Sequence, residues 1–98
     1  MRRYEVKKPT VVFGGHETWL KAIRPMVSGN IKFIGKERII FDKAVFRNAD
    51  VIWIQSNSIS HKQFYRIING ARLNNIPVFY FSNASARKCA SQIEEKDK

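Results

Sequence analysis

Two short runs of this chain are apolar at almost every position, and they restrict its fold more than any other feature. The runs are 10–13 (TVVF) and 51–54 (VIWI), and both are rich in β-branched and aromatic residues. A strand exposed on one face alternates apolar and polar residues, whereas a strand buried on both faces is apolar throughout. We therefore predict two central strands of a parallel sheet, which needs helices on both of its faces.

The first half of the chain adds two helices and a further strand to this pattern. Apolar residues recur at three- and four-residue spacing over 16–27, which predicts an amphipathic helix. The sequence IKFI at 31–34 predicts a strand near the edge of the sheet. Asp42 is a suitable N-cap for a short helix that runs to Asn48.

The second half repeats the alternation of helix and strand. Ser58 or Ser60 opens a helix over 61–74, a strand follows over 77–81 (PVFYF), and a last helix begins after Ser85. Four strands joined by right-handed crossovers predict one small α/β domain of three layers. Its four-stranded parallel sheet is expected in the order 2-1-3-4, which is flavodoxin-like or Rossmann-like.

The expected domain occupies 10–93, between a flexible basic arm over 1–9 and a charged tail over 94–98. Cys89 is the only cysteine and shares the apolar face of the last helix, so we expect it in the core. No apolar run has membrane-spanning length, and the basic N-terminus is not followed by the apolar segment of a signal peptide. With the lone cysteine, these features favour a cytoplasmic protein without membrane contact.

Net charge is the strongest signal in the composition. The chain has 18 Lys and Arg against 8 Asp and Glu, a formal charge of +10 in 98 residues. Such a domain attracts polyanions, because its cations displace the counterions condensed on nucleic-acid phosphates. No acidic residue occurs between Asp50 and Glu94. The residues expected to contact phosphates are Arg2, Arg3, Lys7 and Lys8 in the arm, and Lys62, Arg66 and Arg72 in the helix over 61–74.

Tyr65 shares the polar side of that helix with its cations. An exposed tyrosine can stack on a base when the nucleic acid is single-stranded.

A second group of polar residues follows the strands at the edge where parallel sheets bind ligands. The pair Gly14-Gly15 lacks the residues that complete a dinucleotide-binding or P-loop motif, so a tight turn is the simpler explanation. A nucleotide or another anion in this crevice is an alternative. The candidate crevice residues are Gly14, Gly15, His16, Ser56, Ser58, Ser60 and His61, with Ser82, Asn83 and Ser85 after the fourth strand.

The crevice loops offer little to a catalyst. Two histidines without cysteine or well-placed carboxylates make a poor metal site, so no metal is expected. Ser60 and His61 are adjacent in sequence, which does not place the hydroxyl at the imidazole, and nothing nearby would orient a base. We therefore expect a binding protein rather than an enzyme, without a cofactor.

Three segments carry a family resemblance: VVFGGH at 11–16, NADVIWIQSNSISH at 48–61 and IPVFYFSNAS at 76–85. On these segments the chain resembles the bacterial domain of unknown function 2325 family, over about Thr10 to Ile93. The resemblance implies a small Rossmann-like domain of a bacterium or a bacterial mobile element, and it implies no particular activity. Some members carry additional cysteines that this chain lacks, which disfavours a metal or redox role.

Three functions are compatible with these features. The leading one is a non-enzymatic accessory protein that binds DNA or RNA through backbone charge, as part of a larger protein machine. The second is a module that binds a nucleotide or another anion in the crevice. The third is a protein interaction or dimerisation domain that uses an edge strand or exposed aromatic residues such as Trp19, Phe46 or Tyr80.

Overall fold

The computed structural model describes residues 3–35, 43–81 and 84–98. They form an α/β domain whose four strands are all parallel and lie in the order β2-β1-β3-β4, as predicted. The elements are β1 (Tyr4–Gly14), α1 (Glu17–Ile23), β2 (Val27–Ile34), α2 (Lys43–Arg47), β3 (Val51–Gln55), α3 (His61–Leu73), β4 (Val78–Tyr80) and α4 (Ala86–Asp97). Short 3₁₀ turns lie at Arg24–Met26 and Ser56–Ser58. The architecture is Rossmann-like.

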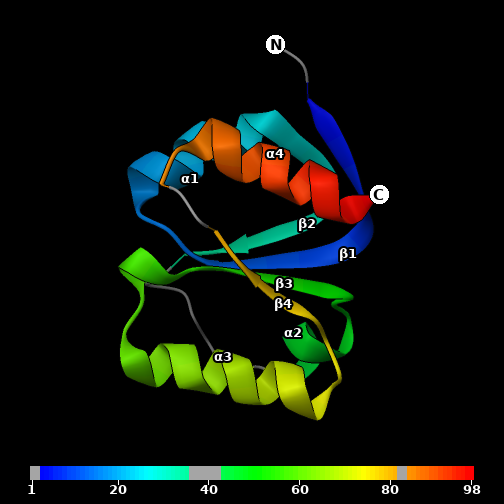
Figure 1. Ribbon diagram of the computed structural model, residues 1–98, viewed down its shortest axis with the longest axis vertical. Helices are drawn as coiled ribbons and strands as arrows, with labels where there is room; N and C mark the ends of the chain where they lie inside the picture. The colour runs from blue at the N-terminus through cyan, green and yellow to red at the C-terminus, as the bar shows by residue number, and fades with distance from the viewer. Residues whose placement is uncertain (1–2, 36–42, 82–83) are drawn as a thin grey trace.

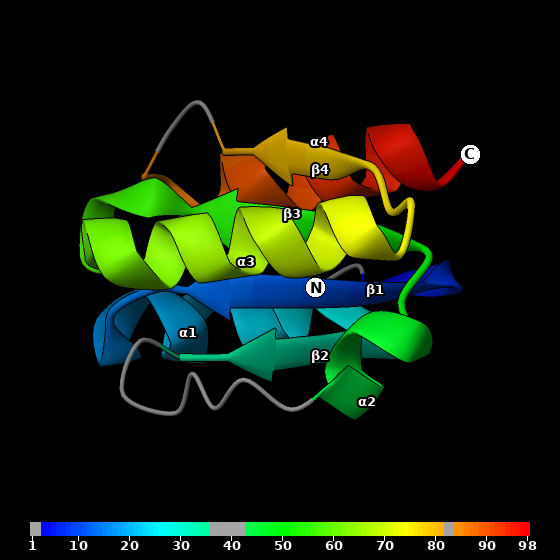
Figure 2. The same cartoon turned by 90° about the horizontal axis from the view of Figure 1, so that it is seen from below.

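Helices cover both faces of the sheet, which confirms the three-layer prediction. Helices α1 and α4 pack on one face, the α1–α4 layer, and α2 and α3 pack on the other, the α2–α3 layer (Figures 1 and 2). No helix among the described residues is long and apolar enough to cross a lipid bilayer.

The central strand β3 shows why both faces need cover. All five of its residues are buried, and successive side chains point to opposite layers. Ile52 and Ile54 lie in the core beneath the α2–α3 layer, whereas Val51 and Trp53 lie in the core beneath the α1–α4 layer. The unbroken apolar run therefore follows from burial on both sides.

The predicted flexible arm is wrong for residues 4–9, because β1 begins at Tyr4. Val6 is buried, and Tyr4 to Val6 pair with the start of β2 at Val27 to Gly29. The register then shifts between Val6 and Thr10, which marks a bulge in β1. One buried valine among charged residues is too weak a pattern to predict this strand from sequence.

The carboxylate of Asp97 holds the bulge in place. It accepts hydrogen bonds from the backbone N–H groups of Lys7 and Lys8, each at 3.0 Å, and from the Tyr4 hydroxyl. Asp97 is buried and ends α4, so residues 94–97 of the predicted charged tail belong to the last helix of the domain. The contact joins the two ends of the described chain.

Other boundaries also differ from the prediction. The helix predicted over 16–27 ends at Ile23, because Pro25 lies in a 3₁₀ turn, and β2 starts at Val27 rather than at residue 31. The predicted cap Asp42 lies outside the described residues.

The predicted start of α3 and the predicted position of Cys89 are confirmed. Ser60 is the N-cap: its hydroxyl accepts from the Gln63 N–H at 3.2 Å, and its own N–H donates to Gln63 Oε1 at 3.0 Å. Cys89 is fully buried in the core on the α4 side, where burial raises the pKa of its thiol.

The Asp97 contact predicts a specific loss of stability in acid. Burial alone would raise the pKa of Asp97, but the bonds from Tyr4, Lys7 and Lys8 hold it below its ordinary value. A lowered folded-state pKa stabilises the fold above the unfolded-state pKa of about 3.9, and this contribution is lost as pH falls further. We expect Asp97→Asn to lower the free energy of unfolding by about 1–3 kcal/mol at neutral pH, measured by urea unfolding.

The difference between Asp97→Asn and the parent should shrink below about pH 4. Glu95→Gln is the matched control, because Glu95 is an exposed acid on the same helix. A gap in unfolding free energy that stays constant down to about pH 2 would contradict the assignment.

Candidate functional site

The loops after β1 and β3 close on each other at the carboxyl end of the sheet. The Gly15 N–H donates a hydrogen bond to Ser58 Oγ, and the Ser58 hydroxyl donates to the Gln55 carbonyl at 3.2 Å. An anion bound at Gly15 would have to displace this serine. The structure therefore gives the glycine N–H a partner within the chain.

The two glycines are required by backbone conformation and by space. Gly14 and Gly15 have φ of +92° and +99°, which side-chain-bearing residues rarely adopt. A Cβ on Gly15 would lie 2.4 Å from a ring carbon of Trp19, and a Cβ on Gly14 would lie 2.7 Å from the Gln55 carbonyl oxygen. These contacts favour the tight-turn interpretation of Gly14-Gly15.

The two histidines of the crevice belong to helices on different faces of the sheet. His16 precedes α1 and His61 begins α3, and these helices lie on opposite faces of the sheet (Figure 1). Across 3–35, 43–81 and 84–98, no three His, Cys, Asp or Glu side chains are grouped as a metal would require. Ser82 and Asn83 lie outside the described residues, and Ser85 precedes α4.

A shallow hollow of about 260 Å³ lies where β3 leads into α3. Its lining residues are Ser56, Ile59, Ser60, His61 and Phe64. Pockets that enclose a whole small ligand usually measure about 300–1,000 Å³. The hollow is an open depression beside α3 rather than an enclosed binding site.

The cations predicted on α3 lie on its solvent side. Lys62, Arg66 and Arg72 are exposed, whereas Ile67 and Ala71 are buried against the sheet. Within the described part of the chain, neither Lys62 nor Arg72 forms an ion pair with an acid.

Helical spacing divides this solvent side into two stripes. One stripe, at spacings of four, three and four residues, consists of Lys62, Arg66, Asn69 and Leu73. The other has the same spacing and borders the core: His61, Tyr65 and Arg72 are exposed, and Ile68 between them is half-buried against the core. The second stripe adjoins β4, because the ring of Phe64 beside it contacts Tyr80 of β4 at 5.9 Å between centroids.

The two helical layers differ in charge. Four described acids lie in the α1–α4 layer, namely Glu17, Glu94, Glu95 and Asp97, and Lys21 there pairs with Glu17 at 3.2 Å. Helices α2 and α3 contain no acidic residue over 43–47 and 61–73. Arg47 of α2 is exposed, and the sequence pattern did not single it out because a five-residue helix shows no clear polar face.

The predicted arm cations lie elsewhere. Arg3, Lys7 and Lys8 are exposed near the start of β1, which is bound to the end of α4 rather than to α3 (Figure 1). The charge of Lys8 acts on Asp97 and helps to lower its pKa. The arm cations therefore lie beside the end of α4 and apart from the cations of α3. Arg2 lies outside the described residues.

The aromatic residues named for dimerisation are exposed to different degrees. Phe46 is buried and stacks on Phe13, so its expected exposure is wrong. Trp19 is half-buried against Phe33 and Phe81. Tyr80 remains a candidate for contact with a partner.

Comparison with protein-family models, curated proteins and solved structures gave no match for this chain. The resemblance to the domain of unknown function 2325 family therefore stays a prediction.

The turn interpretation predicts that Gly15→Ala destabilises the fold. The new Cβ would meet the Trp19 ring at a positive φ, so we expect a loss of more than about 2 kcal/mol in the free energy of unfolding. Urea unfolding followed by circular dichroism measures this loss. Gly35→Ala is the control, because among the described residues its Cβ would approach the flexible Leu20 side chain alone, at 3.1 Å, and should cost less. Equal losses in the two variants would show that the Gly15 turn is not specially constrained.

Proposed function

We propose that this protein is a non-enzymatic module that binds nucleic acid through the phosphates, using the exposed side of the α2–α3 layer. The binding residues are Arg47, Lys62, Arg66 and Arg72. The observation that carries the proposal is the absence of acidic residues from helices α2 and α3 of this layer.

The separation of charge supports binding on one side of the molecule. Cations in the α1–α4 layer lie among acids, which offset their attraction for phosphates. Cations of α3 have no acid on their own helix or on α2. A polyanion approaching the protein is therefore favoured on the α2–α3 side.

The length of the helix suits a phosphate backbone. Lys62 and Arg72 are ten residues apart, which corresponds to about 15 Å along a helix. One strand of duplex DNA carries about four phosphate charges over that length of helix axis. Several cations of α3 can therefore contact one backbone together.

The alternative functions have less support. A nucleotide at Gly14-Gly15 would need the Gly15 N–H, which is already bonded to Ser58. A role beside a larger protein machine, in the cytoplasm of a bacterium or in a mobile element, is part of the proposal and rests on sequence features and the family resemblance alone.

Charge reversal on α3 should weaken binding strongly. In Lys62→Glu/Arg66→Glu/Arg72→Glu we expect affinity for DNA or RNA to fall by at least about tenfold at moderate salt. For duplex DNA, the slope of log affinity against log salt concentration should become shallower by roughly 2 to 3, because three phosphate contacts are lost. Fluorescence anisotropy titrations at several salt concentrations measure both quantities.

A matched control separates local binding from net charge. The variant Arg24→Glu/Arg87→Glu/Lys88→Glu changes the net charge by the same amount on exposed residues of the α1–α4 side. We expect it to weaken binding much less than the α3 variant does. Equal weakening by both triple variants would disprove the assignment to α3.

A further inference from the structure

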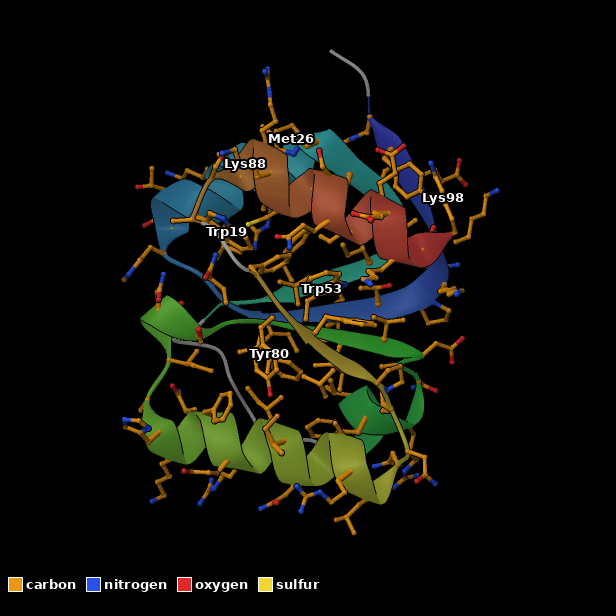
Figure 3. All side chains as sticks on the ribbon, viewed as in Figure 1. Trp19, Met26, Trp53, Tyr80, Lys88 and Lys98 are labelled. Atoms are coloured by element: carbon orange, nitrogen blue, oxygen red, sulfur yellow. The ribbon has the colours of Figure 1, made fainter. Side chains whose placement is uncertain are left out.

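Three aromatic side chains form a contiguous group where α3 meets the edge strand β4. The rings of Phe64 and Tyr65 meet edge to face, with centroids 5.7 Å apart, and those of Phe64 and Tyr80 lie 5.9 Å apart. Tyr80 points from β4 toward α3, whereas Trp53 of the neighbouring strand lies on the α4 side (Figure 3). We call Phe64, Tyr65 and Tyr80 the aromatic ledge.

Much of the ledge is open to solvent. Tyr65 is 61% exposed and Tyr80 is 48% exposed, and Phe64 between them is half-buried. Among the described residues, the exposed large hydrophobic side chains are Tyr65, Leu73 and Tyr80, and all three lie on α3 or β4. Exposed apolar surface is therefore concentrated on the same side as the acid-free helices.

Polar and cationic groups border the ledge. His61 and Arg72 share the helical stripe of Tyr65, four residues before it and seven after it. The hollow lined by Ser56, Ser60 and His61 adjoins Phe64, so hydroxyl and imidazole groups lie next to the rings. These groups suit an unpaired nucleotide. A base can stack on the ring faces, a phosphate can bind the guanidinium group, and the edge of the base can form hydrogen bonds with the hydroxyl and imidazole groups.

We propose that the ligand of the α3 surface is single-stranded nucleic acid, whose bases stack on Tyr65 and Tyr80 while its phosphates contact the α3 cations. This inference rests on the proposed function and specifies its substrate class. Stacking requires unpaired bases, because a duplex covers the faces of its own bases. The phosphates of a duplex would contact the α3 cations, but its bases would not cover Tyr65 and Tyr80.

Charge disfavours the other occupants of the ledge. A second copy of this chain, packed symmetrically on the ledge, would bring two α3 helices together and place their cations close to one another. The formal charge of +10 also opposes self-association. A protein partner would have to be strongly acidic, and it is included below as an outcome.

Three probes separate stacking from phosphate contact. They are a single-stranded oligothymidylate, the same strand with abasic sites in place of its bases, and a duplex of equal length, each titrated by fluorescence anisotropy. We expect the affinity of the parent protein for the oligothymidylate to exceed its affinity for the abasic strand by at least about tenfold. The double variant Tyr65→Ala/Tyr80→Ala should lose this difference and keep its affinity for the abasic strand and the duplex.

The matched control is Tyr65→Phe/Tyr80→Phe, which keeps both rings and should retain the preference for bases. Both tyrosines are exposed, so thermal unfolding should show all variants folded. The Lys62→Glu/Arg66→Glu/Arg72→Glu variant should weaken binding of the abasic strand, which tests the phosphate contacts separately.

Several outcomes would overturn the inference. Stacking on the ledge would be excluded by any of three results. The parent could bind the oligothymidylate and the abasic strand equally, it could bind the duplex more tightly than the oligothymidylate, or the double alanine variant could bind all probes as the parent does. The proposed function would still hold after these results if the α3 charge reversal weakened binding of the abasic strand. Binding of none of the three probes would reject both proposals. Polyglutamate is a fourth probe, for an acidic protein partner. If it bound as tightly as the oligothymidylate, and if this binding required Tyr65 and Tyr80, the ledge would be a protein-docking surface.

Discussion

The parallel pairing of β1 with β3 determines the layered arrangement of this protein. Residues 10–14 of β1 align with 51–55 of β3 in parallel, and the side chains of both segments are buried on the two faces of the sheet. Burial on both faces demands a helical layer on each side. The outer surfaces of these two layers are therefore the main surfaces that the protein offers to partners. One of them carries acids and cations together, and the other carries cations and exposed tyrosines.

The strand order and the layer arrangement could be predicted, because they follow from local patterns in the central strands and from α3. The start of β1 could not be, since it depends on Asp97 at the far end of the chain, whose carboxylate binds the backbone of Lys7 and Lys8. No window of local sequence contains that contact. Phe46 shows the same limit: its burial depends on Gly70 of α3, where a side chain would collide with its ring.

The candidate sites were predictable to different degrees. Helical spacing was enough to place the cations of α3 on the solvent side, because a helix of 13 residues has a clear apolar face. The position of the arm cations relative to α3 was not predictable. It depends on the hydrogen bonds between the bulge in β1 and Asp97 of α4. The crevice residues that follow β1 and β3 were placed at the correct edge of the sheet. However, the hydrogen bond from the Gly15 N–H to Ser58 and the contact of Tyr80 with Phe64 depend on the tertiary structure.

On this proposal the two helical layers have separate roles: the α1–α4 layer is structural and the α2–α3 layer binds the ligand. Titration of the ¹⁵N-labelled protein with a single-stranded oligonucleotide, followed by amide chemical shifts, tests it most directly. Shift changes are expected over residues 61–73, at Tyr80 and around Arg47, with α1 and α4 unaffected. Changes concentrated at Gly14, Gly15 and the start of α1, or spread evenly over both layers, would contradict it.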